Sequence, residues 1–297
     1  MSRQVLGVAV LVAVMLVSGA ALGDETWSGT MSTNFEVDTN WGGGSAPAND
    51  TTTDVAIFSG AAPANQPLLT KDRSVKGLYF SGNGGGWDIF SSGTTYTLSL
   101  GQYGILDHQS GTCKIGTSGT LSISDAATDV KTDNGYLDIA AKITGTGGLK
   151  FTGIRSDNNQ RDFYIRGDND YTGVTNLSQS GWVRMYHANA FGTVANTVTV
   201  SGLSGWRDEA RLYIDADAGP TGLNANKSVQ LGPYGQLHVA SGITLTNDIN
   251  VSGTGNLLQP LRDGTGDRYL TGDVTLNSSL SIHRGGGQGS SPGSMYL

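Results

Sequence analysis

The densest group of ionisable residues in the sequence comprises Arg207, Asp208, Glu209, Arg211, Asp215 and Asp217. Asp215 and Asp217 are two positions apart, so on a β-strand they would share one face while Ile214 points the other way. Clustered carboxylates can hold Ca²⁺ or neutralise a uronate, and a neighbouring Arg can take a proton. Arg211, Asp215 and Asp217 are therefore the candidate catalytic residues of a polysaccharide lyase or hydrolase. We favour the simpler interpretation, a solvated charged surface outside a coil.

Other residues that could do chemistry are scattered. A second acidic group lies in turn-like sequence, and the histidines are far apart, without the close pairs typical of zinc sites. These residues are Asp129, Asp133 and Asp138, and His108, His187, His238 and His283. We predict no metal site and no cofactor.

Cys113 is the only cysteine, so no intramolecular disulfide can form, and we interpret it as a small buried strand residue. The net charge is −7 and the isoelectric point is about 4.9. A phosphate-rich partner would be repelled, so we do not expect nucleic-acid binding.

Two tryptophans near the start of the chain have two interpretations. Trp27 and Trp41 stand in short aromatic segments that precede the strand-like run ending at Phe58. They could close the open end of a repetitive β-fold, which would otherwise expose its interior. Alternatively, exposed indoles could stack on sugar rings, which would make this segment a carbohydrate-binding module. We favour the cap.

The elements that must position these residues are short β-strands. Glycine accounts for 45 of 297 residues, hydrophobic residues for 37% and charged residues for only 14%, a composition typical of a turn-dense β protein. Apolar residues alternate with polar ones in many runs, as expected when one strand face is buried. Such pairs are Leu121 and Ile123, Leu137 and Ile139, Leu149 and Phe151, Val198 and Val200, Leu212 and Ile214, and Leu237 and Val239.

Stacked parallel coils would superpose these side chains into aliphatic columns, so we predict an elongated parallel β-helix. The recurring small-residue-then-leucine pattern gives steps of 15, 16 and 12 residues through Leu106, Leu121, Leu137 and Leu149, and of 20 and 19 through Leu237, Leu257 and Leu276, which predicts a β-helix of variable coils. Polar residues between the apolar ones argue against a sheet covered by helices on both faces.

The stretch from Ile143 to Gly202 also resembles a known family. The run Gly167-Asp168-Asn169-Asp170-Tyr171-Thr172-Gly173, followed by Asn189-Ala190-Phe191-Gly192, is similar to the autotransporter-associated β-strand repeat. Gly145-Thr146-Gly147-Gly148-Leu149 matches the usual lead-in of that repeat. The resemblance implies a secreted or surface-displayed right-handed β-helix, with no catalytic residues attached to the motif.

The amino terminus has the layout of a secretory signal peptide. A cationic start containing Arg3 precedes an apolar run from Val5 to Val17 and a small-residue region, so cleavage is expected after Ala20 or Gly23. An uncleaved membrane anchor is the alternative. We therefore predict a signal peptide at 1–23, a cap at 24–70, β-helix repeats at 71–283 and a Gly/Ser-rich tail at 284–297. Because no capping segment closes the end, we expect a fragment of a longer protein.

Together these patterns predict an exported structural or adhesive surface module that is not an enzyme. The expected partners are extracellular or cell-surface glycans, and no stable membrane span is expected after signal cleavage. A polysaccharide lyase or hydrolase on a β-helix is the first alternative, and a carbohydrate-binding module is the second.

Overall fold

The computed structural model describes residues 24–90, 96–116, 119–123, 127–132, 135–153, 162–179, 181–204, 208–260, 267–282 and 295–296. The predicted signal peptide at 1–23, Asp133, Arg207, His283 and residues 284–294 of the predicted tail lie outside these residues. Among the residues that are described, no helix is long and apolar enough to cross a membrane.

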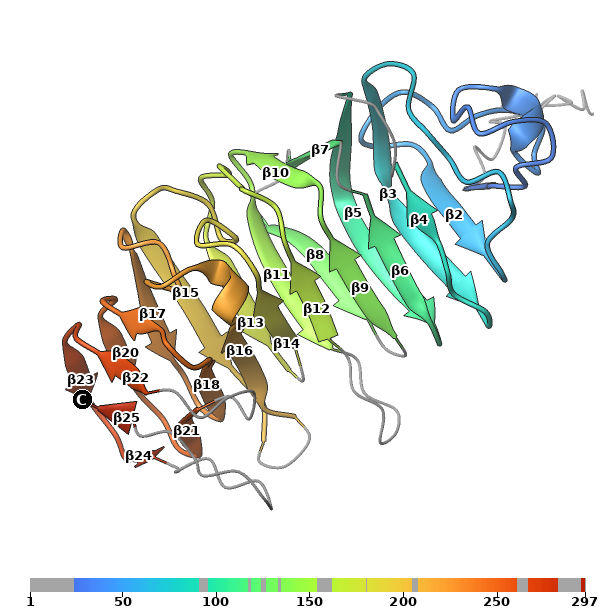
Figure 1. The fold of residues 1–297 in the computed structure, drawn as a ribbon. Helices are drawn as coiled ribbons and strands as arrows, with labels where there is room; N and C mark the ends of the chain where they lie inside the picture. Colours follow the sequence, from blue (N-terminus) through green and yellow to red (C-terminus); the bar gives the residue numbers. More distant parts are fainter. Residues whose placement is uncertain are drawn as a thin grey trace, which may run out of the picture.

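The described chain winds into a right-handed parallel β-helix of about eight turns, as predicted. Figure 1 shows the turns stacked into an elongated body that runs from the residues after Asp24 to the C-terminal strands. Two short 3-10 helices interrupt the strands: η1 (Asp38–Asn40) and η2 (Ala216–Ala218).

Within the described residues, the strands form sheets of 13, 9 and 3 strands, and all their pairings are parallel. The first sheet contains, in spatial order, β1 (Glu25–Thr26), β2 (Val55–Ser59), β3 (Arg73–Gly82), β5 (Thr97–Gln109), β8 (Ala127–Thr132), β11 (Gly148–Gly153), β13 (Thr175–Ser178), β15 (Asn196–Ser201), β17 (Lys227–Leu231), β20 (Ile249–Val251) and β23 (Val274–Leu276), with β7 (Thr120–Ile123) and β10 (Lys142–Gly145) branching from β5. The second sheet contains β4 (Asp88–Ile89), β6 (Thr112–Ile115), β9 (Tyr136–Ile139), β12 (Asp162–Ile165), β14 (Trp182–Met185), β16 (Ala210–Ile214), β18 (Gly235–Val239), β21 (Asn256–Pro260) and β24 (Leu280–Ile282). The third contains β19 (Thr244–Leu245), β22 (Arg268–Leu270) and β25 (Met295–Tyr296).

Inward-facing side chains stack in register from coil to coil. One column of the first sheet runs through Val130, Phe151, Leu177, Val200, Leu231 and Val251. One column of the second runs through Leu137, Phe163, Val183, Leu212, Leu237 and Leu258. All are at most 1% exposed. At roughly 25 cal/mol per Å² of apolar surface, these columns supply the main stabilisation of the coils.

The predicted columns and the variable coil lengths are present, but the steps of 12–16 residues between Leu106 and Leu149 do not correspond to whole coils. Leu121 pairs with Leu98 and Ile143 in the first sheet, whereas Leu137 pairs with Cys113 and Phe163 in the second. Successive leucines therefore lie on different faces of one coil. Equivalent positions are farther apart in sequence: Lys227 is 31 positions after its neighbour Asn196 and 20 before Asn247.

The N-terminal segment closes one end of the solenoid with aromatic rings. The ring of Trp41 lies 5.1 Å from Trp27, 4.8 Å from Phe35 and 6.3 Å from Phe58, measured between centroids. Both indole N–H groups are satisfied: Trp27 Nε1 donates to Asn65 O and Trp41 Nε1 donates to Phe35 O. This packing fits the predicted cap, yet β1 and β2 already belong to the first sheet. Residue 70 is therefore not a break in the sheet.

The other end of the columns is more open. The last described members of the two columns, Leu276 and Ile282, are 57% and 48% exposed. Met295 and Tyr296, within the predicted tail, pair with β22 and so belong to the third sheet.

The motif residues between Asn169 and Gly192 hold neighbouring coils together. Asn169 is fully buried; its Oδ1 accepts from Ile143 N and its Nδ2 donates to Ala190 O, both at 2.7 Å. Gly192 has φ +77°, and a Cβ there would overlap Tyr171 O. The motif residues are therefore those that allow neighbouring coils to stack closely.

We predict that Asn169→Ala destabilises the fold by about 2–6 kcal/mol, because two buried backbone groups lose their partners at about 1–3 kcal/mol each. Chemical denaturation followed by circular dichroism would measure this. Asn176→Ala is the matched control, since Asn176 is half-buried on β13 and its side chain makes no hydrogen bond to the described residues. An equal effect of both substitutions would contradict the assigned role.

Candidate functional site

The outer faces of the two large sheets differ in chemistry. The first sheet presents small polar side chains that bond across coils, such as Thr152 with Ser178 at 3.0 Å and Thr197 with Ser228 at 2.9 Å. The second sheet presents large aromatic and charged side chains on β9, β12, β14, β16 and β18. We call this surface the aromatic–ionic face; it comprises Tyr136, Asp138, Asp162, Tyr164, Arg166, Trp182, Arg184, Tyr186, Arg211, Tyr213 and His238.

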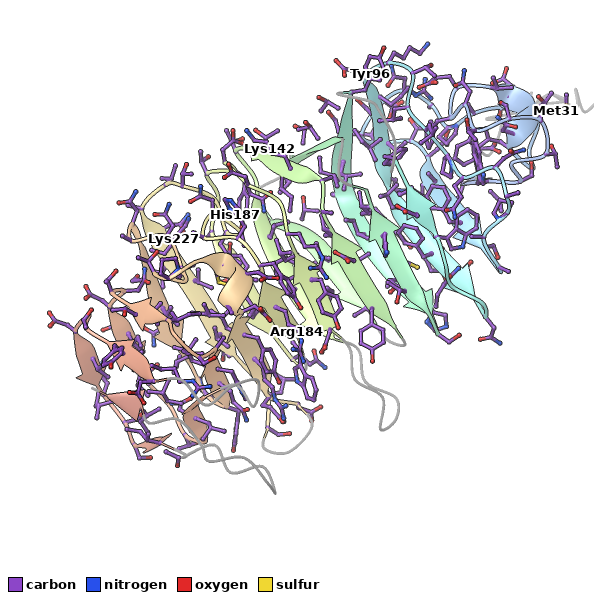
Figure 2. All side chains as sticks on the ribbon, viewed as in Figure 1. Met31, Tyr96, Lys142, Arg184, His187 and Lys227 are labelled. Atoms are coloured by element: carbon purple, nitrogen blue, oxygen red, sulfur yellow. The ribbon has the colours of Figure 1, made fainter. Side chains whose placement is uncertain are left out.

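Register places these side chains in rows along the solenoid axis. One row runs through Asp138, Tyr164, Arg184, Tyr213 and His238. Since neighbouring strands lie about 4.8 Å apart, each side chain touches the next. Figure 2 places Arg184 on this face, and His187 and the buried Lys227 in another part of the coils.

Each arginine of the aromatic–ionic face has an acidic partner. Arg166 Nε donates to Asp138 Oδ1 and Oδ2 at 2.8 and 3.0 Å. Arg184 Nε donates to Asp162 Oδ2 at 3.1 Å. Arg211 Nη2 donates to Glu209 Oε1, and its Nη1 donates to the Tyr213 hydroxyl at 3.1 Å.

The same guanidinium groups stack on aromatic rings. Their carbon atoms lie 4.1 Å from the Tyr186 centroid for Arg166, 4.7 Å from Tyr213 for Arg184 and 3.8 Å from Trp182 for Arg211. Cation–π contacts of this kind contribute about 0.5–2 kcal/mol, most where water is excluded. The face is therefore a preorganised layer rather than a set of independent surface charges.

Burial perturbs the titration of this layer. Desolvation raises the pKa of Asp162, although the charge of Arg184 acts in the opposite direction. Desolvation also raises the pKa of Tyr213, and it lowers the pKa of His238 to about 3, with the charges of Arg211 and Arg184 adding to the effect. His238 is consequently neutral at physiological pH.

The predicted catalytic group is not assembled as predicted. β16 ends at Ile214, and Asp215 caps η2 by accepting from the backbone N–H of Asp217 at 3.4 Å. The two carboxylates therefore do not share a strand face. Asp217 is exposed, while Arg211 belongs to the aromatic–ionic face.

The predicted stacking surface on Trp27 and Trp41 is wrong. These residues are 3% and 2% exposed and pack edge to face against each other. The need to fill the end of the solenoid buries both ring faces, so neither is available to a sugar.

The other titratable residues do not converge. Asp129 receives the ammonium groups of Lys131 and Lys150 on the first sheet, while Asp138 lies on the second. In the described ranges, no group of three or more His, Cys, Asp or Glu side chains could hold a metal ion.

Cys113 is buried in β6, as predicted. Its thiol lies 3.4 Å from Asp107 Oδ1, and desolvation, with the neighbouring carboxylate, raises the pKa of the thiol. Both effects favour the protonated, unreactive form.

Lys227 is the one cation among the described residues whose pKa burial lowers to about 8. A lysine with a depressed pKa could act as a general base. However, the residue is 3% exposed, and its Nζ donates to Asn196 Oδ1 at 2.8 Å within the coil stack. A polymer on the surface could not reach it, so the shift reflects packing.

Sequence reasoning missed the aromatic–ionic face as a whole. The sequence does contain a sign of this face, namely the outward residues that stand between the inward apolar pairs. Asp138 separates Leu137 from Ile139, and Arg184 separates Val183 from Met185. Comparison of the chain with protein families, with curated proteins and with solved structures found no match. The resemblance to the autotransporter-associated repeat stays a prediction.

We predict that Lys227→Met changes the pH dependence of stability. The pKa of Lys227 is about 8 in the folded state and near 10.5 when unfolded, so the unfolded state binds the proton more tightly. Wild-type stability should rise with pH from 8 to 10.5, and this contribution should be missing in the variant. Urea denaturation of both proteins at pH 7, 8, 9 and 10 would measure it. A constant difference in unfolding free energy would refute a depressed pKa.

Proposed function

We propose that this protein is an exported structural or adhesive β-helix module that binds extracellular or cell-surface glycans without transforming them. The observation that carries the proposal is the aromatic–ionic face, in which each coil adds one aromatic or charged residue per row at fixed spacing. A rigid rod with repeated contacts favours binding through many weak interactions, which add by effective concentration.

The charged groups of this face support binding better than catalysis. Each arginine is paired with an acid and stacked on a ring, as shown by Arg184 with Asp162 and Tyr213. An arginine so restrained is poorly suited to accept a proton from a substrate, because its charge is stabilised by both neighbours. Asp215 and Asp217 lie beyond the strand, and the Asp215 carboxylate caps η2 by accepting from the backbone N–H of Asp217.

Export is the second part of the proposal. The cationic start, apolar run and small-residue region before Asp24 support a Sec-type signal peptide. The autotransporter-type repeat motif is consistent with surface display.

We predict that expression in a bacterial host yields an exported chain that begins at Ala21 or Asp24. Intact mass and N-terminal sequencing of the exported fraction would identify the start. Arg3→Glu is expected to reduce export, because it removes the positive charge at the start of the signal peptide. Arg73→Glu is not a suitable control, because Arg73 is buried. Lys71→Glu, at an exposed position, is the matched charge reversal. A mature chain that keeps residues 1–20 would refute cleavage.

We also predict adhesion without turnover. Protein-coated beads should be retained on slides coated with a mixture of neutral polysaccharides, anionic polysaccharides and mucin, increasingly so at higher protein density. The same polymers incubated with the protein should gain no new reducing ends and no ultraviolet absorbance of unsaturated uronates. An activity that Asp215→Ala with Asp217→Ala abolishes would establish the lyase or hydrolase alternative instead.

A further inference from the structure

Three neighbouring side chains on the aromatic–ionic face have buried polar atoms without a partner. These atoms are Asp162 Oδ1, Trp182 Nε1 and Arg211 Nε. Asp162 pairs in register with Trp182, and Trp182 pairs with Arg211, on the consecutive strands β12, β14 and β16. The atoms thus form a short row of one acceptor and two donors along the solenoid axis.

Such a row is unfavourable in the free protein. Asp162 is 1% exposed, and its other oxygen, Oδ2, already accepts from Arg184 Nε at 3.1 Å and the Tyr164 hydroxyl at 3.4 Å. Buried polar groups are ordinarily paired, and an unpaired group weakens the fold. Three unpaired atoms in adjacent coils therefore indicate a position where an external group completes the hydrogen bonding.

A ligand reaches this row only by displacing Arg211. Arg211 covers the Trp182 ring at 3.8 Å, but its side chain remains 20% exposed. Displacement of this one guanidinium would uncover the indole and would break its bonds to Glu209 and to the Tyr213 hydroxyl. The uncovered surface combines an aromatic face with the acceptor Asp162 Oδ1 and the donor Trp182 Nε1, a combination that suits a ring carrying hydroxyl groups.

The charges of the protein determine which hydroxyl-bearing polymers could bind this face. Arg166, Arg184 and Arg211 are each neutralised by an acidic neighbour, and the exposed Lys114 lies one strand beyond the face, beside Asp138. The protein as a whole has a net charge of −7. Uronates and sulfated glycans would be repelled, whereas a neutral hydroxyl can both donate to a carboxylate and accept from an N–H.

We infer that β12, β14 and β16 form a binding site for a neutral polysaccharide that lies along the solenoid axis. Its hydroxyl groups donate to Asp162 Oδ1 and accept from Trp182 Nε1, and a sugar ring takes the place of the Arg211 guanidinium on the Trp182 indole. This inference rests on the proposed function and specifies its surface and its class of ligand.

Native affinity electrophoresis tests the inference. The probes are gels containing hydroxyethylcellulose, galactomannan or dextran as neutral polymers, and polygalacturonate or alginate as anionic ones. The wild-type protein should be retarded by at least one neutral polymer and by neither anionic one. Trp182→Phe keeps an aromatic ring but removes the N–H, and it should weaken association by about three- to ten-fold, the effect of one hydrogen bond.

The denaturation midpoint of the variant distinguishes a role of Trp182 in binding from a merely structural role. The Trp182 N–H has no partner in the free protein, so Trp182→Phe should lower the denaturation midpoint only slightly, through the smaller ring beneath Arg211. Tyr79→Ala is the control for loss of a half-buried aromatic residue, since Tyr79 lies on the outer face of the first sheet. It should leave retardation unchanged.

Three results would overturn the inference: no retardation by any neutral polymer, retardation by the anionic polymers, or equal binding by the wild type and Trp182→Phe. In the third case the polymer binds elsewhere. Bead adhesion that persists in any of these cases would leave the proposed function intact, whereas loss of adhesion by the wild type would remove both.

Discussion

The structure depends on the superposition of inward-facing side chains in successive parallel coils. A single coil has no second layer against which to bury its apolar residues, so each is stable only on its neighbours. Phe151, for example, is buried because Val130 and Leu177 lie directly beside it in the sheet. Once register is fixed on the inside, the outward positions are fixed too, because side chains alternate strictly between faces. The aromatic–ionic face is therefore a consequence of the core.

The alternation of apolar and polar residues can be recognised in the sequence, but the length of each coil cannot. Pairs such as Leu212 and Ile214 identify strands and their inward faces, and the structure confirms both. Coil length depends on the corners, where insertions are tolerated, so the spacing between equivalent residues varies from 20 to 31. The leucine pattern mixed positions from two sheets because both faces of a coil use the same alternation. Asp215 and Asp217 were misplaced for a related reason: a strand cannot be distinguished from the turn that ends it when small residues such as Ala216 and Ala218 follow.

The aromatic–ionic face could have been found only by aligning the coils first. Each of its residues is unremarkable in sequence, and an isolated exposed ion pair is worth little. Stacked in register, Asp162, Arg184 and Tyr213 restrain one another, and burial makes each pairing count for more. This coupling has a cost, because groups at the edge of the layer, such as Asp162 Oδ1, are desolvated without being paired.

The shifted pKa values in this protein can be traced to the close packing of its coils. Lys227, His238 and Cys113 have strongly shifted pKa values, and all three are nearly or fully buried; Lys227 and Cys113 lie within the coil stack, and His238 lies in the aromatic–ionic face. In an enzyme, such shifts mark groups that meet the substrate; here they follow from the close stacking that the columns impose. Asp162 differs from Lys227 and Cys113, because it lies on the outer face beneath the partly exposed side chain of Arg184. A surface polymer that displaces this layer would therefore meet the Asp162 carboxylate on β12, between β9 and β14.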